Sequence, residues 1–564
     1  MALFLAALAL APSCAREDAP SPAARNTVVL NAEIYTLADA RPWAEALAFS
    51  ADGVLLAVGS EAEVRAAAGP GSLPIDAGGR FLLPGFQDTH VHIPEAGLNA
   101  SLCYLRPRRS LREYSRRLAQ CAAEQPEEEW VRAAGASLYD LRDSVESPLE
   151  ALDRAVPDRP ALVIDDLGHA VWTNSSGLAA AGIRHDDPDP QGGVLHRRVP
   201  SGKLSGLLLE DAQQLVRNAA AAPDEEVYRG LLRALARLAR HGITSVSDAG
   251  GFWAQRHPEA WKKALAEGTL TVRAANALYL YPALDAPTQL AELEQRFDDR
   301  SDWLRFDTIK IYVDGILDLG TAALLEPYTV PPDERFSNGF RYFEHEQLKA
   351  YVSALHALGY RMNFHVVGDA AVRQALDALE AIATDARGIA ERRHRLTHLY
   401  LVDPADRKRF AELGVLADLQ HGPIAIDPRY HEDLREILGP RASELLPTGA
   451  LMASGAEVVL SSDWDADPLS PFGSIQRSVL RSSNAVPSVA SAIEAVTLGA
   501  ARALGHDDRT GSLEPGKLAD FVVLDQNLLE IDVETIRDTK VLATFVGGRA
   551  VYVADALTSQ IALE

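Results

Sequence analysis

A short apolar segment of the chain ends in two histidines separated by one residue, His90 and His92. In an extended strand, residues i and i+2 point to the same face, so both imidazoles can converge on one point while Val91 faces the other way. Two imidazoles at a strand end provide half of a typical metal site. The pair alone is moderate evidence, since many such pairs are ordinary surface or hydrogen-bonded histidines.

Four further residues of metal-binding or acid–base type lie in or at the end of later apolar segments: Lys310, His365, His398 and Asp463. Each has an ordinary alternative. His398 can be a hydrogen-bonded core histidine, Lys310 a salt-bridge partner and Asp463 the cap of a loop. Six such residues, in order on the first, fourth, fifth, sixth and eighth of the strand-like segments, are difficult to explain as coincidence, so we interpret them as one site.

The five segments that carry these residues belong to a longer series of strand-like runs separated by helical patterns. The series has eight runs, at residues 83–92, 243–248, 272–278, 308–313, 361–367, 395–399, 414–419 and 457–463. Alternating strands and helices predict a parallel sheet, and eight such units predict a (β/α)8 TIM barrel. The carboxyl ends of barrel strands open on one face, which is where the six residues are expected to meet.

Both ends of the chain are rich in short strands and turns, such as the Gly547-Gly548 pair. We therefore expect residues 26–82 and 505–564 to form one small β-sandwich domain and residues 83–504 to form the barrel. The gap after the first barrel strand is too long for a loop, so about residues 95–229 are predicted to be an insertion with its own helices and strands. Insertions at this end of a barrel strand lie over the active site.

The composition is that of a soluble globular protein, with 564 residues, 47% hydrophobic residues and a net charge of -24. No long Lys/Arg-rich block is present. Binding to nucleic acid is therefore not expected, and an anionic membrane surface would repel most of the protein. A small-molecule substrate is the expected partner, and the oligomeric state is open.

The first 25 residues differ from the rest and resemble an export leader followed by a flexible linker. Cys14 can be the lipid-modified first residue of a bacterial lipoprotein, or the residues around it can be an ordinary cleavage site. We therefore expect a periplasmic protein or one anchored by lipid at the bacterial cell envelope, with no other membrane contact. Cys103 and Cys121 can pair in an oxidising compartment, although the sequence does not decide this.

On these residues, the chain resembles the amidohydrolase superfamily, in the branch of YtcJ-like and N-substituted formamide deformylase-like proteins (amidohydrolase family 3). The resemblance extends over nearly everything after Asn26. The segments that carry it are residues 83–92, 310–315, 363–370, 461–464, the strand of His398, and two outside the barrel strands, 168–175 and 511–524.

The resemblance implies that His90, His92 and Asp463 hold one divalent ion and that His365 and His398 hold a second. Zinc is the default expectation, and iron or manganese stays open. Lys310 would bridge the two ions. Since an ammonium group has donors only, this requires a carboxylated lysine. If Lys310 stays an amine, a single ion is the better interpretation.

The implied reaction is hydrolysis of a C–N bond in an amide, N-acyl, N-formyl or cyclic amide group. Bound divalent ions lower the pKa of water from about 15.7 toward about 7 and polarise a carbonyl. Asp463 would be the catalytic residue that takes a proton from water and passes it to the leaving nitrogen. His169, Asn174 and His421 are candidate substrate contacts, and structural roles for His169 and Asn174 are at least as well supported. Thr397 stands where relatives often have Glu.

Two other functions remain open. The first is deamination of a ring amidine at a single ion, which would not need Lys310. The second is a surface-tethered binding protein whose metal is structural. A structural ion prefers a closed four-ligand site from neighbouring segments, whereas ligands drawn from five strand ends favour an open, catalytic site.

Overall fold

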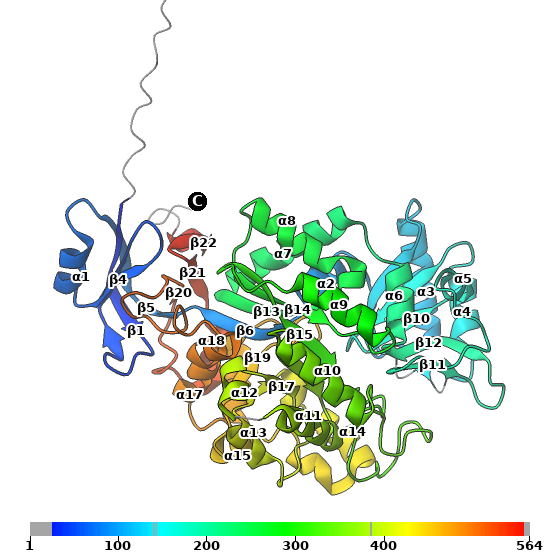
Figure 1. Cartoon of the computed structure of the whole chain (residues 1–564). Helices are drawn as coiled ribbons and strands as arrows, with labels where there is room; N and C mark the ends of the chain where they lie inside the picture. The colour runs from blue at the N-terminus through cyan, green and yellow to red at the C-terminus, as the bar shows by residue number, and fades with distance from the viewer. Residues whose placement is uncertain (1–24, 139–140, 143, 384–385, 558–564) are drawn as a thin grey trace, which may run out of the picture.

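The computed structural model describes residues 25–138, 141–142, 144–383 and 386–557, and its centre is a parallel eight-stranded sheet (Figure 1). The strand order follows the chain, which confirms the predicted barrel. The strands are β6 (Phe86–Val91), β13 (Ile243–Gly251), β14 (Arg273–Tyr279), β15 (Leu304–Tyr312), β16 (Arg361–Val366), β17 (Arg395–His398), β18 (Leu416–Gln420) and β19 (Val458–Ser461). Strand β19 ends two residues before Asp463, which the sequence had suggested as its last residue.

The sheet closes between its first and last strands through the backbone of the predicted site. The amide of Asp463 donates to the carbonyl of His90 at 2.9 Å, and the amide of His92 donates to the carbonyl of Trp464 at 2.6 Å. Val91 and Trp464 form a parallel bridge. The ends of β6 and β19 are therefore joined where their candidate ligands lie.

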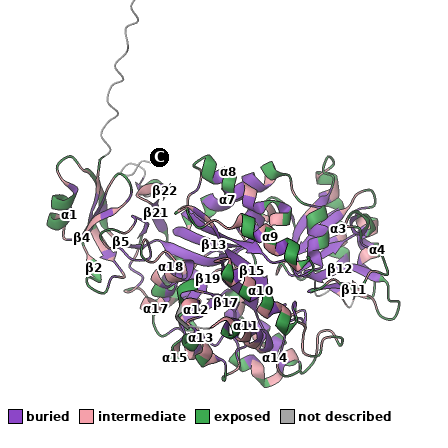
Figure 2. Cartoon of the chain, in the orientation of Figure 1, coloured by how far each residue is buried: buried purple, intermediate pink, exposed green. Residues whose placement is uncertain are grey.

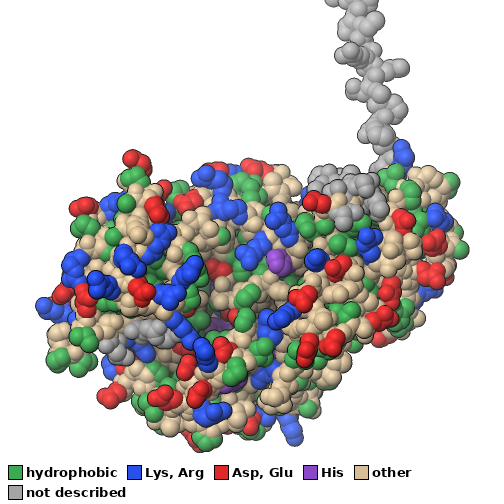
Figure 3. Space-filling view, turned by 180° about the vertical axis from the view of Figure 1, so that it is seen from behind, with side chains coloured by type: hydrophobic (Ala, Val, Ile, Leu, Met, Phe, Trp, Pro, Cys, Tyr) green, Lys and Arg blue, Asp and Glu red, His purple; other side chains and the backbone are tan. Residues whose placement is uncertain are grey.

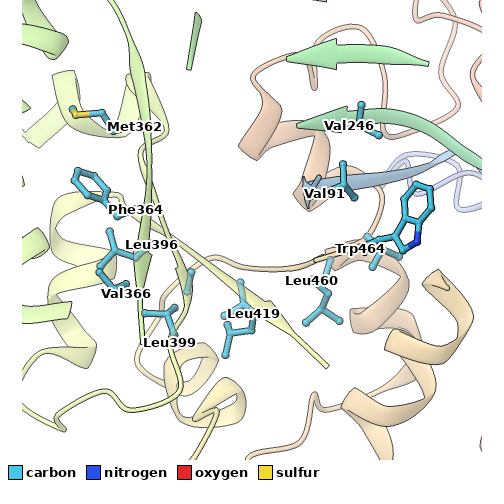
Figure 4. Packing of buried hydrophobic residues seen from close by; sticks show 14 of the residues in the cluster. Val91, Val246, Met362, Phe364, Val366, Leu396, Leu399, Leu419, Leu460 and Trp464 are labelled. Atoms are coloured by element: carbon cyan, nitrogen blue, oxygen red, sulfur yellow. The ribbon is translucent and has the colours of Figure 1, made fainter. Parts of the chain in front are cut away.

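Alternation along the strands separates the apolar outer face of the barrel from its polar interior. On β16, Met362, Phe364 and Val366 pack with the other buried hydrophobic residues (Figure 4), whereas Asn363 and His365 point the other way. Figure 2 shows the buried strands surrounded by helices whose outer faces are exposed. The sequence pattern of β16 thus fixes the direction of the His365 side chain.

Inside the barrel, a buried polar layer lies below the site. The carboxylate of Asp418 accepts from the hydroxyls of Thr89 at 2.7 Å and Ser461 at 2.6 Å. It also lies 3.5 Å from the guanidinium of Arg395. A buried charge is costly unless it is paired and hydrogen-bonded, and the Asp418 carboxylate is both. These contacts join four strands of the barrel below the site.

Helices between the strands surround the barrel. Helix α7 runs from Asp224 to Arg240 and buries Leu231, Leu235 and Leu238, which share one face at helical spacing. The others are α8 (His257–Ala266), α9 (Ala286–Arg296), α10 (His345–Ala357), α11 (Asp369–Ile382), α12 (Ala386–Arg392), α13 (Arg407–Leu413), α14 (Pro428–Leu438), α15 (Thr448–Ala453), α16 (Pro471–Leu480), α17 (Val489–Ala495) and α18 (Leu498–Leu504), with short 3-10 helices η2 (Trp253–Gln255), η3 (Pro423–Ile426), η4 (Gly439–Glu444), η5 (Val533–Asp538) and η6 (Asp555–Leu557).

Strands from the two ends of the chain form one continuous sheet beside the barrel, seen as blue and red arrows in Figure 1. These strands are β1 (Thr27–Tyr35), β2 (Trp43–Ala44), β3 (Ala46–Phe49), β4 (Leu55–Gly59), β5 (Leu73–Pro84), β20 (Phe521–Leu524), β21 (Val541–Val546) and β22 (Arg549–Val553). The sheet curls on itself, since Phe49 of β3 lies 6.2 Å from Phe521 and 6.4 Å from Phe545 by ring centroids. Helix α1 (Glu61–Ala68) packs on its other face.

The segment after β6 forms a second layer with its own six-stranded sheet, drawn in cyan in Figure 1. Its elements are α2 (Ile93–Asn99), β7 (Cys103–Tyr104), α3 (Leu111–Glu124), β8 (Val131–Ala136), α4 (Pro148–Ala155), β9 (Ala161–Asp165), β10 (Ala170–Thr173), α5 (Ser175–Ala180), β11 (Gly193–Arg197), β12 (Leu204–Glu210) and α6 (Gln213–Ala219). Cys103 and Cys121 form a disulfide that ties β7 to α3.

The surface carries intermingled basic and acidic side chains on the face shown in Figure 3. Among the described residues, no helix is both long and apolar enough to span a bilayer. Cys14 and the other residues up to residue 24, where an export leader is expected, lie outside the described residues.

Candidate metal centre

All six candidate ligands converge at the carboxyl ends of the barrel strands, around the carboxylate of Asp463. Its Oδ1 lies 3.3 Å from His90 Nε2 and 3.4 Å from His92 Nε2, and its Oδ2 lies 3.9 Å from His398 Nδ1. Lys310 Nζ is 3.0 Å from His90 Nε2. The ring of His365 adjoins that of His398, with centroids 4.3 Å apart. The ligand atoms of five strand ends therefore surround one small volume.

Two of these residues have an unusual backbone conformation. His398 has a φ of 77° and Asp463 a φ of 57°, both in the left-handed region that non-glycine residues rarely adopt. Such conformations cost about 1–3 kcal/mol each and persist where the surrounding structure enforces them. Here they turn the two side chains from their strand ends toward the centre.

A carboxylate orients His92. Its Nδ1 lies 3.1 Å from Oε2 of Glu95, one turn further along the chain, which leaves Nε2 to face Asp463. The other oxygen of Glu95 forms a buried ion pair with Arg217 of α6. A carboxylate that holds the second nitrogen of a histidine is the usual support of a metal-ligating imidazole.

A backbone carbonyl and a threonine fix two more imidazoles. Nε2 of His365 donates to the carbonyl of Gly315 at 3.2 Å, and its Nδ1 is buried without a hydrogen-bond partner. Nδ1 of His90 lies 3.2 Å from Oγ1 of Thr397, so its Nε2 faces the centre. Thr397, the departure from the family pattern, thus supports a candidate ligand.

The pKa shifts at the centre differ from one group to the next. Burial opposes a charged His92, but its bonds to Asp463 and Glu95 outweigh burial and raise its pKa to about 10. Burial also opposes a charged Asp463, yet the pKa of Asp463 is held well below its usual range by His90 and its neighbours. Burial lowers the pKa of Lys310 to about 7, so a nucleophilic amine is present near neutral pH.

These residues fit a divalent metal ion. Ligand atoms of His90, His92 and Asp463 lie within 4.8 Å of one another. The buried Nδ1 of His365 has a free lone pair and no partner. Imidazole and carboxylate are ligands that suit zinc.

His169 of the insertion lies beside the centre. Its Nδ1 is 2.6 Å from Oε2 of Glu210, and its ring centroid is 5.1 Å from that of His365. Glu210 also accepts from the hydroxyl of Tyr342 at 2.8 Å and from Thr321. Burial opposes a charged His169, but Glu210 outweighs it and raises the pKa of His169. His169 is therefore well placed for a substrate contact.

The structure corrects the expectation for Asn174. Its Oδ1 accepts from the amides of Ala161 and Gly177 at 3.0 and 2.9 Å, and its Nδ2 donates to two backbone carbonyls. Asn174 caps α5 and lines neither cavity at the barrel mouth. Its hydrogen-bonding capacity is used within the insertion, so its role is structural.

His421 is also absent from the walls of these cavities. It is buried, and its Nε2 lies 3.0 Å from the hydroxyl of Thr448. Burial, together with nearby Arg481 and Arg477, lowers its pKa to about 3. His421 therefore packs behind β18 and does not face either cavity, contrary to the expectation of a substrate contact.

Two cavities meet at the centre. The large cavity has a volume of about 490 Å³ and the small cavity about 140 Å³, and His169, His398 and Asp463 line both. The insertion supplies much of the wall of the large cavity, including Asp165, Asp211 and Arg217. The sequence predicted that the insertion would cover the site but did not indicate these residues.

The sequence profile of the amidohydrolase family matches residues 74–552. The chain belongs to the amidohydrolase family. This amidohydrolase is 28% identical to the putative amidohydrolase YtcJ of Bacillus subtilis over 539 residues, which cover 92% of this chain and 98% of that protein. It is 26% identical to the N-substituted formamide deformylase of Arthrobacter pascens over 551 residues, 93% of this chain and 98% of that protein.

The fold of the amidohydrolase is also that of solved structures. An uncharacterized metal-dependent hydrolase from Pyrococcus horikoshii aligns with a TM-score of 0.71 at 22% identity, covering 90% of this chain and 99% of that one. The family indicates a hydrolase, and the likeness to this solved structure supports the barrel fold.

Several residues that the structure places at the centre of this amidohydrolase were not predicted. Glu95 lies three residues after His92, and Tyr312 lies two residues after Lys310. Such spacings place side chains near each other in a helix or a strand, so the sequence could have indicated both residues. Tyr312 stacks on His365 with ring centroids 4.3 Å apart. Glu210 and Arg217 carried no such signal, because tertiary contacts alone bring them to the barrel.

Proposed function

We propose that the protein hydrolyses a carbon–nitrogen bond of an amide, N-acyl, N-formyl or cyclic amide substrate. The observation that carries the proposal is the convergence of four imidazoles, the Asp463 carboxylate and the Lys310 amine at the base of two cavities. The printed name of the Arthrobacter relative, a formamide deformylase, agrees with this bond type.

The metal, when bound, would activate water and polarise the substrate carbonyl. His90, His92 and Asp463 would hold one ion, and His365 and His398 a second. Asp463 would accept a proton from the attacking water and deliver it to the leaving nitrogen, since its carboxylate faces both cavities. The hydroxyl oxygen joins the carbonyl carbon as the C–N bond breaks, giving a carboxylate and an amine.

We further propose two zinc ions, bridged by a carboxylated Lys310. A buried amine with a pKa of about 7 is partly neutral at physiological pH, and the neutral amine is the form that reacts with carbon dioxide. The reaction joins the nitrogen to the carbon of carbon dioxide and releases one proton, which leaves a carbamate with two oxygens. If Lys310 stays an amine, a single ion is expected.

The test combines elemental analysis with a substrate panel. Purified protein is expected to contain about two ions of zinc per chain and to hydrolyse members of a panel of N-acylated amino acids, formamides and cyclic imides. Lys310→Met is expected to reduce the metal content to about one ion and kcat/KM by at least about 100-fold, as the loss of a metal-supporting group does. Lys408→Met on the barrel exterior is the matched control.

Two results would contradict the proposal. One ion per chain with release of ammonia from ring amidines would make the protein a deaminase. Bound metal without turnover of any substrate in the panel would favour a binding protein with a structural ion.

We also propose that the protein is exported to the periplasm or held at the cell envelope by lipid on Cys14, with small molecules as its substrates. The Cys103–Cys121 disulfide supports an oxidising compartment, because such bonds are rare in reducing ones. Mass spectrometry of protein from the membrane and soluble fractions separates a lipid-modified Cys14 from a cleaved soluble form.

A further inference from the structure

The small cavity differs in chemistry from the large one. Ile316, Leu317, Val367 and Ile424 contribute aliphatic side chains to its wall. Leu317 and Val367 belong to an apolar cluster that includes Tyr430 and α14. The carboxyl groups on its wall besides Asp463 are Asp318 and Asp467, and Asp318 accepts from the hydroxyl of Tyr430 at 3.1 Å.

The large cavity has an aromatic and acidic wall. Phe252, Tyr279, Tyr312 and Tyr342 lie in mutual ring contact along one side of it. Carboxyl groups also face it, and burial raises the pKa of Asp165 to about 8 and of Asp211 to about 7. They outnumber the guanidinium groups of Arg217 and Arg237, and they are those of Glu95, Asp165, Asp166, Glu210, Asp211, Asp463 and Asp465. A group that becomes an ammonium ion on release is therefore better accommodated on this side.

We propose that the small cavity binds the acyl side chain of the substrate and selects for a short, apolar one. This rests on the proposed hydrolysis of an amide. The scissile bond lies at the wall that both cavities share, beside Asp463, and the amine portion extends into the large cavity. The small cavity has a volume of about 140 Å³. A water molecule, which is close in size to a methylene group, takes up about 30 Å³, so the cavity holds roughly four or five such groups. An acyl chain of about four carbons therefore fits, and a much longer one does not.

Hydrolysis of a graded acyl series by the metal-loaded protein tests the proposal. The substrates are the N-formyl, N-acetyl, N-butyryl and N-octanoyl derivatives of phenethylamine, whose ring suits the aromatic wall of the large cavity. The wild type is expected to prefer butyryl over octanoyl by about tenfold or more in kcat/KM, the discrimination that a pocket of fixed size provides.

Variants at Ile424 assign the preference to the small cavity. This side chain is half-buried on η3 and is not one of the candidate ligands, although it lines the same small cavity. Ile424→Phe is expected to lower the butyryl-to-formyl ratio of kcat/KM by about tenfold, and Ile424→Ala to move the length limit toward octanoyl. The matched control is Ala100→Phe, which adds the same ring to the large cavity alone and is expected to change the ratio less than twofold.

A binding measurement separates this inference from the proposed reaction. The affinity of formate, acetate and butyrate for the metal-loaded protein is measured by calorimetry, with an expected gain of about fourfold per added methylene that Ile424→Phe removes. Length-dependent binding without amide hydrolysis would support the inference and reject the proposed reaction. Hydrolysis whose chain-length profile is the same in both Ile424 variants and the wild type would overturn the inference alone. Absence of both hydrolysis and length-dependent binding would overturn both.

Discussion

At the scale of single residues, Glu95 connects the centre with the insertion. One oxygen is bonded to His92 Nδ1 and the other to Arg217, so one carboxylate orients both a candidate ligand and a cationic group in the wall of the large cavity. An added Cβ at Gly250 would lie 2.8 Å from this carboxylate and 3.2 Å from the imidazole of His92. The glycine thus leaves room for the pair.

Replacement of this carboxylate is expected to weaken metal binding. Glu95→Gln keeps the shape but removes the charge that supports His92, and should raise the metal dissociation constant about 10- to 100-fold. Titration against a competing chelator measures the change. Glu124→Gln on the exposed end of α3 is the control, and an unchanged dissociation constant for Glu95→Gln would show that His92 is not a ligand supported in this way.

At the scale of elements, the loop after β15 joins the barrel to the insertion. The Asp314 carboxylate accepts from the amides of Ala323, Val367 and Gly368 at 2.8–2.9 Å, which fixes the loop against the end of β16. The next residue, Gly315, accepts from His365 and lies against Glu210 of β12. This loop therefore fixes the orientation of the His365 ring and the position of the Glu210 carboxylate, which in turn contacts His169.

A methyl group at Gly315 should disturb this junction. An added Cβ would overlap Glu210 Oε1 and Thr321 Oγ1. Gly315→Ala is therefore expected to displace Glu210 from His169 and to lower kcat/KM by about 10- to 100-fold, the effect of a displacement near 1 Å. Steady-state kinetics and metal analysis measure it, with Gly388→Ala of α12 as control, since a Cβ there meets nothing within 4 Å. Activity equal to that of the control would show that the contact between Glu210 and His169 is not needed for activity.

At the scale of the whole molecule, a buried histidine far from the centre couples stability to pH. His394 accepts from the amide of Met362 through Nδ1 at 3.1 Å, and burial, with His356, Arg392 and Arg361 nearby, lowers its pKa to about 3. In the unfolded chain a histidine titrates near about 6.5. Between these values the unfolded chain binds a proton that the folded protein does not, so the free energy of unfolding falls as pH falls through this range.

The contribution of this group can be isolated. His394→Asn keeps an acceptor for Met362 and is expected to lower the pH slope of the free energy of unfolding between pH 3 and 6.5 by up to about 1.4 kcal/mol per pH unit. Urea unfolding at several pH values measures the slope, with His185→Asn on the surface as control. A slope equal to that of the wild type would show that His394 is not buried as a neutral group.

The order of strands and the direction of their side chains could be predicted from the sequence. Alternation on β16 and the His-x-His spacing on β6 are local properties of an extended chain, so the positions of His90, His92 and His365 followed from them. The assignment of Asn174 to substrate failed for the complementary reason. Asn174 points into the insertion and forms four hydrogen bonds there. Most of the partners of these bonds lie elsewhere in the chain, so the sequence around Asn174 does not specify them.

By itself, the sequence determined the barrel and the set of side chains at the carboxyl ends of its strands, because strand periodicity and residue type are properties of short stretches of chain. Only the tertiary structure decided that Glu95 and Arg217 form one pair, that Glu210 reaches His169, and that two cavities of different chemistry meet at Asp463. These residues lie far apart along the chain, and the packing of the insertion on the barrel brings them together. The volume of a cavity between packed elements cannot be predicted from any short stretch of sequence.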